Sequence, residues 1–218
     1  MLKFHLITLF PEACSAYLDA SIVGRAQKNK KIRVSYESPR PHVENKWGKV
    51  DERPYGGGPG MVMTALPVVK AVQKTLRRTK KEKTVLVWFS PSGTPFTNKE
   101  ADKLTKYSDV VLVCGRYEGI DERAKSMLKN FGTVKTYAVG EAVYTGGEIP
   151  ALAIVDAVTR RIPGVLGKDE SVEERRVASP AVYTRPEVIT FQKKKYKVPA
   201  VLLTGHAAKI EAWRTKKK

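Results

Sequence analysis

Apolar residues occur along much of the chain in short runs, which longer amphipathic stretches separate. The runs at 84–89 and 110–113 are apolar throughout, which is typical of strands buried on both faces of a sheet. Residues 3–10 are also apolar and β-leaning, and residues 32–36 alternate as a strand does. Strands of this kind that alternate with helices predict an α/β fold, in which helices cover a parallel sheet on both faces.

The helices are predicted from apolar periodicity and from residues typical of helix ends. Thr97, with Glu100 three residues later, forms a capping-box pattern, and Pro163-Gly164 ends the last predicted helix. A long loop rich in proline and glycine covers 38–61. The expected helices cover 11–23, 66–77, 97–107, a stretch that Asp121 can cap, and 147–162.

The charge of the chain favours a polyanionic partner. The sequence has 40 Lys and Arg against 22 Asp and Glu, a formal net charge of +18. The excess is greatest from Gln192 onward, where nine basic residues face one acid, Glu211. Such a run can also be a solvated tail. Further basic residues at 28–33 and 77–81 make a nucleic acid the favoured partner.

Cysteine usage and hydropathy favour a cytoplasmic protein. Cys14 and Cys114 lie far apart, without metal-ligand spacing, and suit a reducing compartment. No apolar run reaches the roughly 18–20 residues of a membrane helix. Pro11 follows the first strand too soon for a secretory signal. We therefore expect no association with a membrane.

Three loops that contain glycine are expected at one edge of the sheet. Ligands of open parallel sheets bind beyond the carboxyl ends of the strands. The loops cover 90–93, 114–121 and 139–147. Glycine lets the backbone approach a ligand closely, so that peptide groups can contact an adenine edge or a carboxylate. One such loop is typical of a turn, whereas three together favour a cofactor site.

Other chemistries find little support in the sequence. The glycine-rich segment 53–61 lacks the Lys-Ser/Thr ending of a Walker A motif and is not a GxGxxG fingerprint, so a flexible substrate-side loop is the better interpretation. The three histidines show no ligand spacing, and no metal site is expected. A G-x-S-x-G nucleophile elbow is absent from the sequence.

Six blocks of the sequence match one known family, in order along almost the whole chain. They are FHLITLFPE (4–12), DERPYGGGPGM (51–61), CGRYEGIDER (114–123), YTGGEIPA (144–151), IPGVLG (162–167) and YTRPE (183–187). With these blocks the chain closely resembles bacterial tRNA (guanine-N1)-methyltransferases, which belong to the knotted SPOUT class.

The resemblance implies a deep trefoil knot, a homodimer with active sites at the subunit interface, and S-adenosylmethionine as methyl donor. The acceptor would be N1 of the guanine 3′ of the anticodon, in tRNAs with another guanine before it. The implied domains are a knotted cofactor-binding catalytic domain over 1–165, a charged linker and active-site loop over 166–182, and a short basic tRNA-binding unit over 183–218.

The resemblance also assigns residues to the two ligands by position. The adenosine would lie against Val139, Gly140, Ala142 and Tyr144, of which Ala142 replaces a tyrosine of the family. The methionine end would lie near Ser90, Pro91, Gly115, Glu118, Gly146 and Pro150. The same loops add Tyr117, Glu141, Val143 and Gly147 to the cofactor site. The substrate would contact Tyr55, Gly57, Gly58, Pro59, Gly60 and Arg185.

The reaction requires a base, because guanine N1 carries a proton at neutral pH. An arginine near O6 would stabilise the negative charge that develops there. Arg160 matches the family's catalytic arginine, although at a helix end it could simply complement the helix dipole. Arg175 stands where the family has its aspartate base and cannot accept a proton. We therefore predict Glu174 as the base, before Glu173 or Asp169.

The sequence leaves two other functions open. Arg175 is compatible with a tRNA-binding protein that has lost its catalytic base. The chain stops soon after Trp213-Arg214, where relatives continue into a fuller C-terminal domain, and this is compatible with a methyltransferase of another RNA position. In either case the lysines after residue 192 would contact phosphates, which would make RNA binding strongly dependent on salt.

Overall fold

The computed structural model describes residues 1–77, 79–166 and 181–216, and it divides the chain into two compact units, Met1–Leu166 and Gly167–Lys218. Glu174, Glu173, Asp169 and Arg175 lie outside the described residues. In the described residues no helix is long and apolar enough to cross a membrane.

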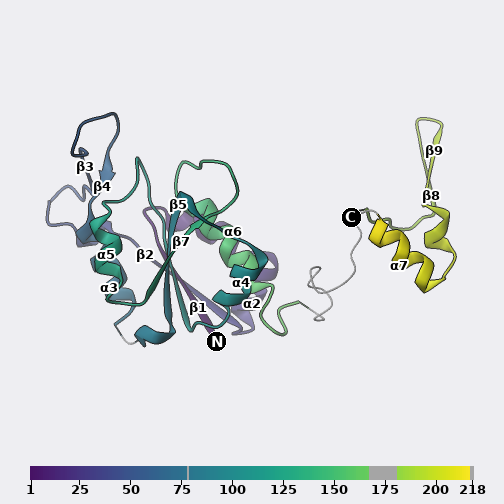
Figure 1. Ribbon diagram of the computed structural model, residues 1–218, viewed down its shortest axis with the longest axis horizontal. Coiled ribbons are helices and arrows are strands. Elements are labelled where there is room, and N and C mark those ends of the chain that lie inside the picture. Colours follow the sequence, from purple (N-terminus) through teal and green to yellow (C-terminus); the bar gives the residue numbers. More distant parts are fainter. Residues whose placement is uncertain (78, 167–180, 217–218) are drawn as a thin grey trace. The chain divides into compact units, whose positions relative to one another are not determined.

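The first unit is built on a five-stranded parallel sheet (Figure 1). Its strands lie in the order β2-β1-β6-β5-β7. They are β1 (Leu2–Ile7), β2 (Ile32–Glu37), β5 (Thr84–Pro95), β6 (Asp109–Val113) and β7 (Thr133–Ala138). All neighbouring strands of this sheet pair in parallel, which confirms the α/β prediction.

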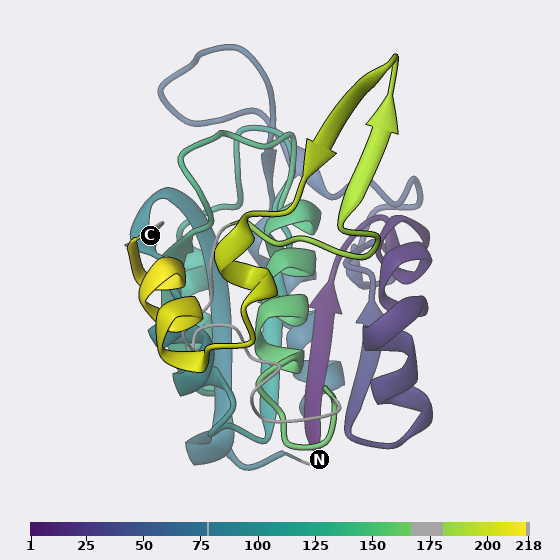
Figure 2. The ribbon, with the colours of Figure 1, turned by 90° about the vertical axis from the view of Figure 1, so that its right-hand side faces the viewer.

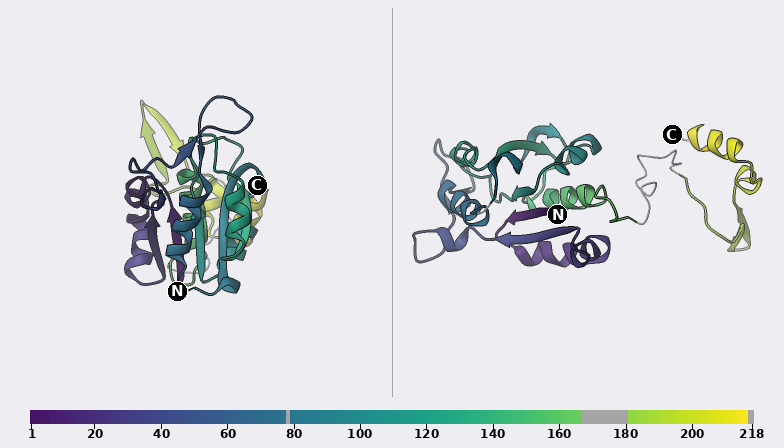
Figure 3. Two further views of the ribbon diagram at one scale, coloured as in Figure 1. Left: turned by 90° about the vertical axis from the view of Figure 1, so that its left-hand side faces the viewer. Right: turned by 90° about the horizontal axis from the view of Figure 1, so that it is seen from below.

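Helices cover both faces of the sheet, as predicted. Figure 1 shows α3 and α5 on one side of the strands and α4 and α6 on the other, and the left panel of Figure 3 looks onto the α3 and α5 layer. The helices are α1 (Pro11–Leu18), α2 (Ser21–Lys28), α3 (Ala65–Thr75), α4 (Asn98–Leu104), α5 (Arg123–Leu128) and α6 (Glu148–Thr159).

Alternating residues of the strands supply two separate apolar cores. Phe4, Val87 and Leu112 are buried in the core that also holds Ile154 of α6. Residues one position along, such as Leu86 and Val111, are buried with Val68 and Ala71 of α3 in the other core. This two-faced burial explains why β5 and β6 are continuous apolar runs in the sequence, because successive strand residues point to opposite faces.

Several local predictions were wrong. The predicted helix 11–23 is two helices, because the chain turns at Asp19-Ala20 and Ser21 has a φ of +49°. The first strand ends at Ile7 instead of Phe10. Thr97 is the N-cap of α4, but its side chain makes no capping hydrogen bond. Glu100, the other half of the expected capping box, instead accepts hydrogen bonds from Lys103 (2.6 Å) and the Tyr137 hydroxyl (2.7 Å).

The loop segments contain more structure than their composition indicates. The stretch 38–61 includes the 3-10 turn η1 (Arg40–His42) and β3 (Asp51–Glu52), which pairs antiparallel with β4 (Val62–Met63). A further 3-10 turn, η2, covers Lys81–Lys83. The predicted loop 90–93 lies within β5, where the pairing with β7 shifts register between Phe89 and Thr94.

The described part of the second unit is a β-hairpin followed by helical segments, shown in yellow-green and yellow in Figure 2. Strands β8 (Val188–Phe191) and β9 (Lys194–Lys197) pair antiparallel. They precede the 3-10 turn η5 (Ala200–Leu203) and α7 (Ala207–Lys216). The Tyr183 and Trp213 rings lie 6.3 Å apart between centroids, so residues near the two ends of its described part pack together.

Candidate active site

The three glycine-containing loops meet at the carboxyl ends of β5, β6 and β7 and line one pocket of about 410 Å³. Every residue predicted from the sequence to contact the cofactor lines this pocket except Glu141. Trp88, Phe89 and Val113 add apolar surface from the strands below. The volume lies within the range of small-molecule sites, roughly 300–1,000 Å³.

Close backbone packing holds the third loop against the second. The Gly147 N–H donates to the Gly115 carbonyl at 2.8 Å. A Cβ at Gly147 would lie 2.6 Å from Cys114 Cα, and one at Gly93 would lie 2.6 Å from the Tyr137 carbonyl carbon. Because real Cβ atoms cannot approach backbone so closely, glycine is required at both positions. The loop geometry therefore depends on residues that carry no functional group.

A buried carboxylate at the start of α6 fixes the turn that leads out of the pocket. Glu148 is 4% exposed, and its Oε1 accepts a hydrogen bond from the Thr8 hydroxyl at 2.7 Å. Its Oε2 lies 3.0 Å from Arg116 Nε. The Arg116 guanidinium in turn lies 4.5 Å from the centroid of the Phe10 ring. A carboxylate in the first turn also complements the positive end of the helix dipole.

The two cysteines are packing residues beside this carboxylate. Burial, and then the nearby Glu148 carboxylate, raise the pKa of the Cys114 thiol well above its usual value. Burial and the same carboxylate raise the pKa of Cys14 to about 11. Both thiols are therefore neutral at physiological pH, and neither is a nucleophile.

The loop after residue 53 is fastened to the rim of the pocket. The Met63 N–H donates to Gly119 O at 2.9 Å, and the Asp121 N–H donates to Met63 O at 2.9 Å. The Glu118 N–H donates to Met61 O at 3.0 Å. A Cβ at Gly60 would lie 2.5–2.9 Å from atoms of the Glu118 side chain. The end of the predicted substrate loop therefore touches a residue of the predicted cofactor site.

A larger cavity of about 1360 Å³ lies beside the pocket, and Glu122 lines both. Tyr55 lines this larger cavity and is fully exposed, whereas Gly57, Gly58 and Pro59 are exposed in the loop beyond it. Asp121 and Arg123 lie on its α5 side. Hydrogen bonds from the Arg123 side chain lower the pKa of Asp121, which also accepts the Arg123 backbone N–H at 3.0 Å. The prediction that Asp121 caps α5 was wrong, because the N-cap of this helix is Glu122, which makes no side-chain capping hydrogen bond.

Arg160, one of the two predicted catalytic residues, does not line this pocket. Arg160 is the C-cap of α6, whereas Gly147 and Pro150 at the other end of that helix line the pocket. At 1.5 Å per residue, about 15 Å of helix separates Pro150 from Arg160. Arg185 is exposed in the second unit, and Glu174 lies outside the described residues.

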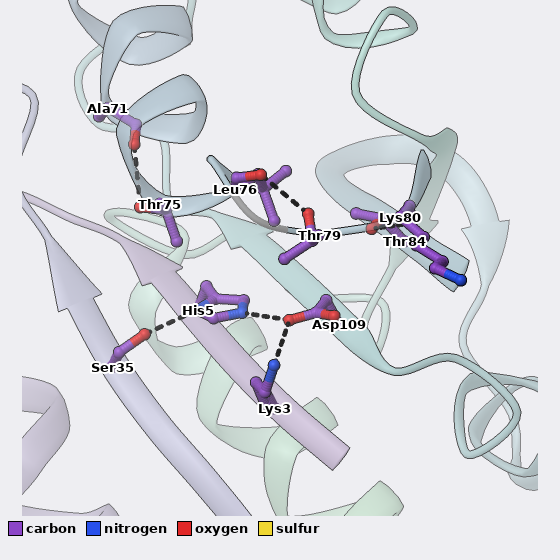
Figure 4. A network of polar contacts seen from close by, with 10 residues as sticks. All are labelled: Lys3, His5, Ser35, Ala71, Thr75, Leu76, Thr79, Lys80, Thr84 and Asp109. Atoms are coloured by element: carbon purple, nitrogen blue, oxygen red, sulfur yellow. Dashed lines mark hydrogen bonds and ion pairs between the residues drawn. The ribbon is translucent and has the colours of Figure 1, made fainter. Parts of the chain in front are cut away.

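A second buried polar cluster lies at the opposite end of the strands (Figure 4). His5 Nδ1 is 2.7 Å from Ser35 Oγ, and its Nε2 is 2.9 Å from Asp109 Oδ1. Lys3 Nζ is 3.7 Å from the same oxygen. Neither cavity described above is lined by these residues, and they link β2, β1 and β6. We interpret His5 as a structural residue.

In the described residues no three His, Cys, Asp or Glu side chains are grouped to hold a metal ion.

Comparison with known proteins identifies the family. The family model described as tRNA (Guanine-1)-methyltransferase TrmD matches residues 2–218. The chain belongs to this family. It is 40% identical over 220 residues to the tRNA (guanine-N(1)-)-methyltransferase of Dictyoglomus turgidum, covering 99% of this chain and 84% of that protein. The same enzyme of Pseudoalteromonas atlantica is 38% identical, with 98% and 78% covered, and that of Campylobacter jejuni is 36% identical, with 98% and 91% covered.

Methyltransferases of this family use S-adenosylmethionine. The pocket fits such a molecule, because exposed backbone of glycine-containing loops rings an apolar floor. Our sequence analysis did not assign Glu148, Arg116 or Thr8 to the site. All three lie within the matching blocks, but only the structure brings the β1–α1 connection, the second loop and the start of α6 together.

Proposed function

We propose that this chain transfers a methyl group from S-adenosylmethionine to N1 of the guanine 3′ of the anticodon in tRNA. The observation that carries the proposal is the pocket itself, in which three loops predicted from the sequence to bind the cofactor converge in a chain of this family. Bound S-adenosylmethionine would supply an electrophilic methyl group beside Gly146 and Glu118. The larger cavity next to it, lined by Tyr55, would admit the nucleotide.

The chain's own residues would prepare the guanine for methylation. Glu174 would accept the N1 proton, and Arg160 would stabilise the negative charge on O6. Tyr55 and Gly60 would hold the nucleotide so that N1 faces the methyl group, which reduces the entropic part of the barrier. The contact between Gly60 and Glu118 couples the position of this loop to the rim of the cofactor pocket.

We further propose that the active site forms between two copies of the chain. Arg160 and the pocket lie at opposite ends of α6, and an arginine side chain is too short to span the roughly 15 Å between them. In a two-fold symmetric dimer, Arg160 of one copy could face the pocket of the other. This arrangement would make a single copy inactive even when its cofactor pocket is complete.

The path of the chain supports the proposed trefoil knot. Strand β7 lies at one edge of the sheet, whereas α6, the next helix, packs against α1 and α2, which lie on the β1 and β2 side. The connection passes the end of β6, where Gly147 lies against the Cys114 backbone. An unknotted chain that is pulled by both ends extends to roughly 3.3–3.6 Å per residue. A knot would tighten under the same force, so the end-to-end length of the unfolded chain would be shorter than this value.

The basic second unit would add affinity for tRNA. Its lysines after Gln192 are exposed in the described residues up to Thr215. Contacts from these lysines to phosphates would release counterions, so tRNA affinity should fall steeply as salt rises. We propose the three domain roles that the resemblance to the family implies. Residues 1–165 would form the knotted cofactor-binding catalytic domain, 166–182 the charged linker and active-site loop, and 183–218 the basic tRNA-binding unit.

The proposal is tested by single-turnover transfer of labelled methyl from S-adenosylmethionine to a tRNA transcript with the guanine-guanine pair. Wild type should methylate this transcript, and Glu174→Gln should lose at least about a hundredfold in rate, within the range for one acid–base group. Cofactor affinity should not change. Glu173→Gln is the matched control. If Glu174→Gln keeps its rate while Glu173→Gln or Asp169→Asn loses it, the base is assigned wrongly but the function stands.

Two outcomes would favour the alternative functions. Tight binding of cofactor and tRNA without any transfer would favour a tRNA-binding protein that has lost its base, which Arg175 would explain. Methylation of a transcript that lacks the guanine-guanine pair would favour a methyltransferase of another RNA position.

A further inference from the structure

The hairpin of the second unit presents an exposed face of aromatic and apolar side chains. Strand residues alternate between faces, and Ile189 pairs with Tyr196 while Phe191 pairs with Lys194. These four residues therefore share one face. Ile189 is 52% exposed, Phe191 is 61% exposed and Tyr196 is 50% exposed. Figure 2 shows the two strands extending away from the rest of their unit.

The hairpin is held by its own backbone and carries only positive charge. The turn residues Gln192 and Lys193 have φ of +49° and +61°, which is typical of a tight two-residue hairpin turn. The Val198 N–H donates to Glu187 O at 3.0 Å and closes the base of the ladder. Within 188–197 there is no Asp or Glu, and the lysines stand at 193, 194, 195 and 197. Lys194 Nζ lies 5.6 Å from the centroid of the Tyr196 ring.

This combination of aromatic rings and lysines fits unpaired RNA better than a protein surface. Lysine is depleted from the cores of protein interfaces, whereas single-stranded nucleic acid is bound by aromatic rings that stack on bases within a positively charged surface. Phe191 and Tyr196 are diagonal neighbours across the two strands, with Cα atoms roughly 7–8 Å apart. That spacing leaves room for a flat base between the rings. A fully paired duplex would offer phosphates to the lysines but no base face to the rings.

We propose that the face formed by Ile189, Phe191, Lys194 and Tyr196 is a stacking site for an unpaired base of the RNA substrate. Lys194, on the same face, and Lys193, in the turn beside it, would contact the flanking phosphates, whereas Lys195 and Lys197 lie on the opposite face of the hairpin. The inference rests on the proposed function only for the identity of the RNA as tRNA. The stacking site would recognise that part of the RNA is single-stranded, in addition to the guanine that enters the catalytic pocket.

The test compares full-length variants that keep or remove the rings. Phe191→Ala/Tyr196→Ala should bind a labelled oligouridylate of about 12 nucleotides at least roughly tenfold more weakly than wild type, since each stacked base contributes a factor of about 5 to 150. Phe191→Leu/Tyr196→Leu keeps apolar area but no ring, and should be weakened similarly. Phe191→Tyr/Tyr196→Phe keeps both rings and should bind as wild type does. Binding of a blunt RNA duplex should be the same for all variants.

Three results would overturn the inference. The first is unchanged oligouridylate affinity in the alanine variant, and the second is full affinity in the leucine variant. The third is a change in oligomeric state by sedimentation when the rings are removed, which would assign the face to a second copy of the chain. The methyl-transfer assay on wild type is independent of this one. If wild type transfers no methyl group but its rings still bind oligouridylate, the proposed function fails and the stacking site stands.

Discussion

At the residue scale, Glu148 shows how the geometry of the pocket depends on a side chain that does not line it. Its carboxylate ties Thr8 of the β1–α1 connection and Arg116 of the second loop to the start of α6. Nothing in the sequence indicated this role, because Glu148 is one carboxylate in a mostly apolar helix and its partners are distant in the sequence. Thr8 stands more than a hundred residues before it, and Arg116 about thirty. The glycines beside it, which the sequence analysis predicted to contact the cofactor, line the pocket.

The buried histidine gives a pH dependence at the same scale. Burial lowers the pKa of His5 below its ordinary value, against the opposing effect of its hydrogen bond to Asp109. The unfolded chain therefore binds a proton at higher pH than the folded chain. The stability that depends on neutral His5 is present above about pH 6.5 and is lost as pH falls through the lower, folded-state pKa.

We therefore expect the free energy of unfolding of wild type to decrease more between about pH 7 and about pH 5 than that of His5→Gln. Urea denaturation at the two pH values measures the difference. His206→Gln, a change of an exposed histidine in the second unit, is the control and should keep the wild-type pH dependence. Equal pH dependence in His5→Gln and wild type would show that His5 does not titrate in this way.

At the scale of elements, sequence patterns predicted the strands whose two faces are buried and missed one edge strand and the exposed hairpin. Strands β5 and β6 were recognisable because both of their faces are covered. The edge strand β7 was missed, because Thr133, Lys135 and Thr136 interrupt its apolar pattern. The hairpin β8–β9 was missed for a related reason, since its lysines resemble a solvated tail. The break between α1 and α2 depends on a backbone turn that composition does not reveal.

The loop that ends at Met61 gives a prediction at this scale. Gly60 and Gly57 both have positive φ, +82° and +79°, so alanine is strained by roughly 1–3 kcal/mol at either position. Only at Gly60 would a Cβ also displace the Glu118 side chain, because nothing lies within 4 Å of a Cβ at Gly57. Gly60→Ala should therefore raise the Kd for S-adenosylmethionine several-fold, and Gly57→Ala should leave it unchanged.

Equilibrium dialysis with labelled cofactor measures both values on folded protein. Thermal unfolding of the same samples would report any general damage, which we expect to be equal in the two variants. A similar rise in Kd for both, or for neither, would mean that the loop does not act on the pocket through Glu118.

At the scale of the whole molecule, the separation of Arg160 from the pocket predicts complementation between inactive variants. Arg160→Ala removes the proposed catalytic arginine. Gly140→Val damages the pocket loop, because φ is +76° at this position and a Cβ would lie 3.3 Å from the Tyr144 hydroxyl oxygen. In a mixed dimer, one of the two shared sites would combine an intact pocket with an intact Arg160.

Mixing the two variants under conditions that exchange subunits should restore about a quarter of wild-type transfer, because half of the dimers are mixed and each has one complete site. Each variant alone is the control and should stay inactive at the same total concentration. If the mixture gains no activity although sedimentation shows mixed dimers, the pocket and Arg160 do not act across the interface.

The central claim is that the pocket formed by the three loops supports methylation of guanine N1 beside the anticodon. The most direct measurement is to identify the methylated nucleoside, and its position, in a tRNA transcript treated with wild-type protein and S-adenosylmethionine. The account predicts 1-methylguanosine at the guanine 3′ of the anticodon, detected by mass spectrometry and by a stop of reverse transcription at that position, with no product from Gly140→Val. A methyl group on another base or another atom, or equal product from Gly140→Val, would contradict it.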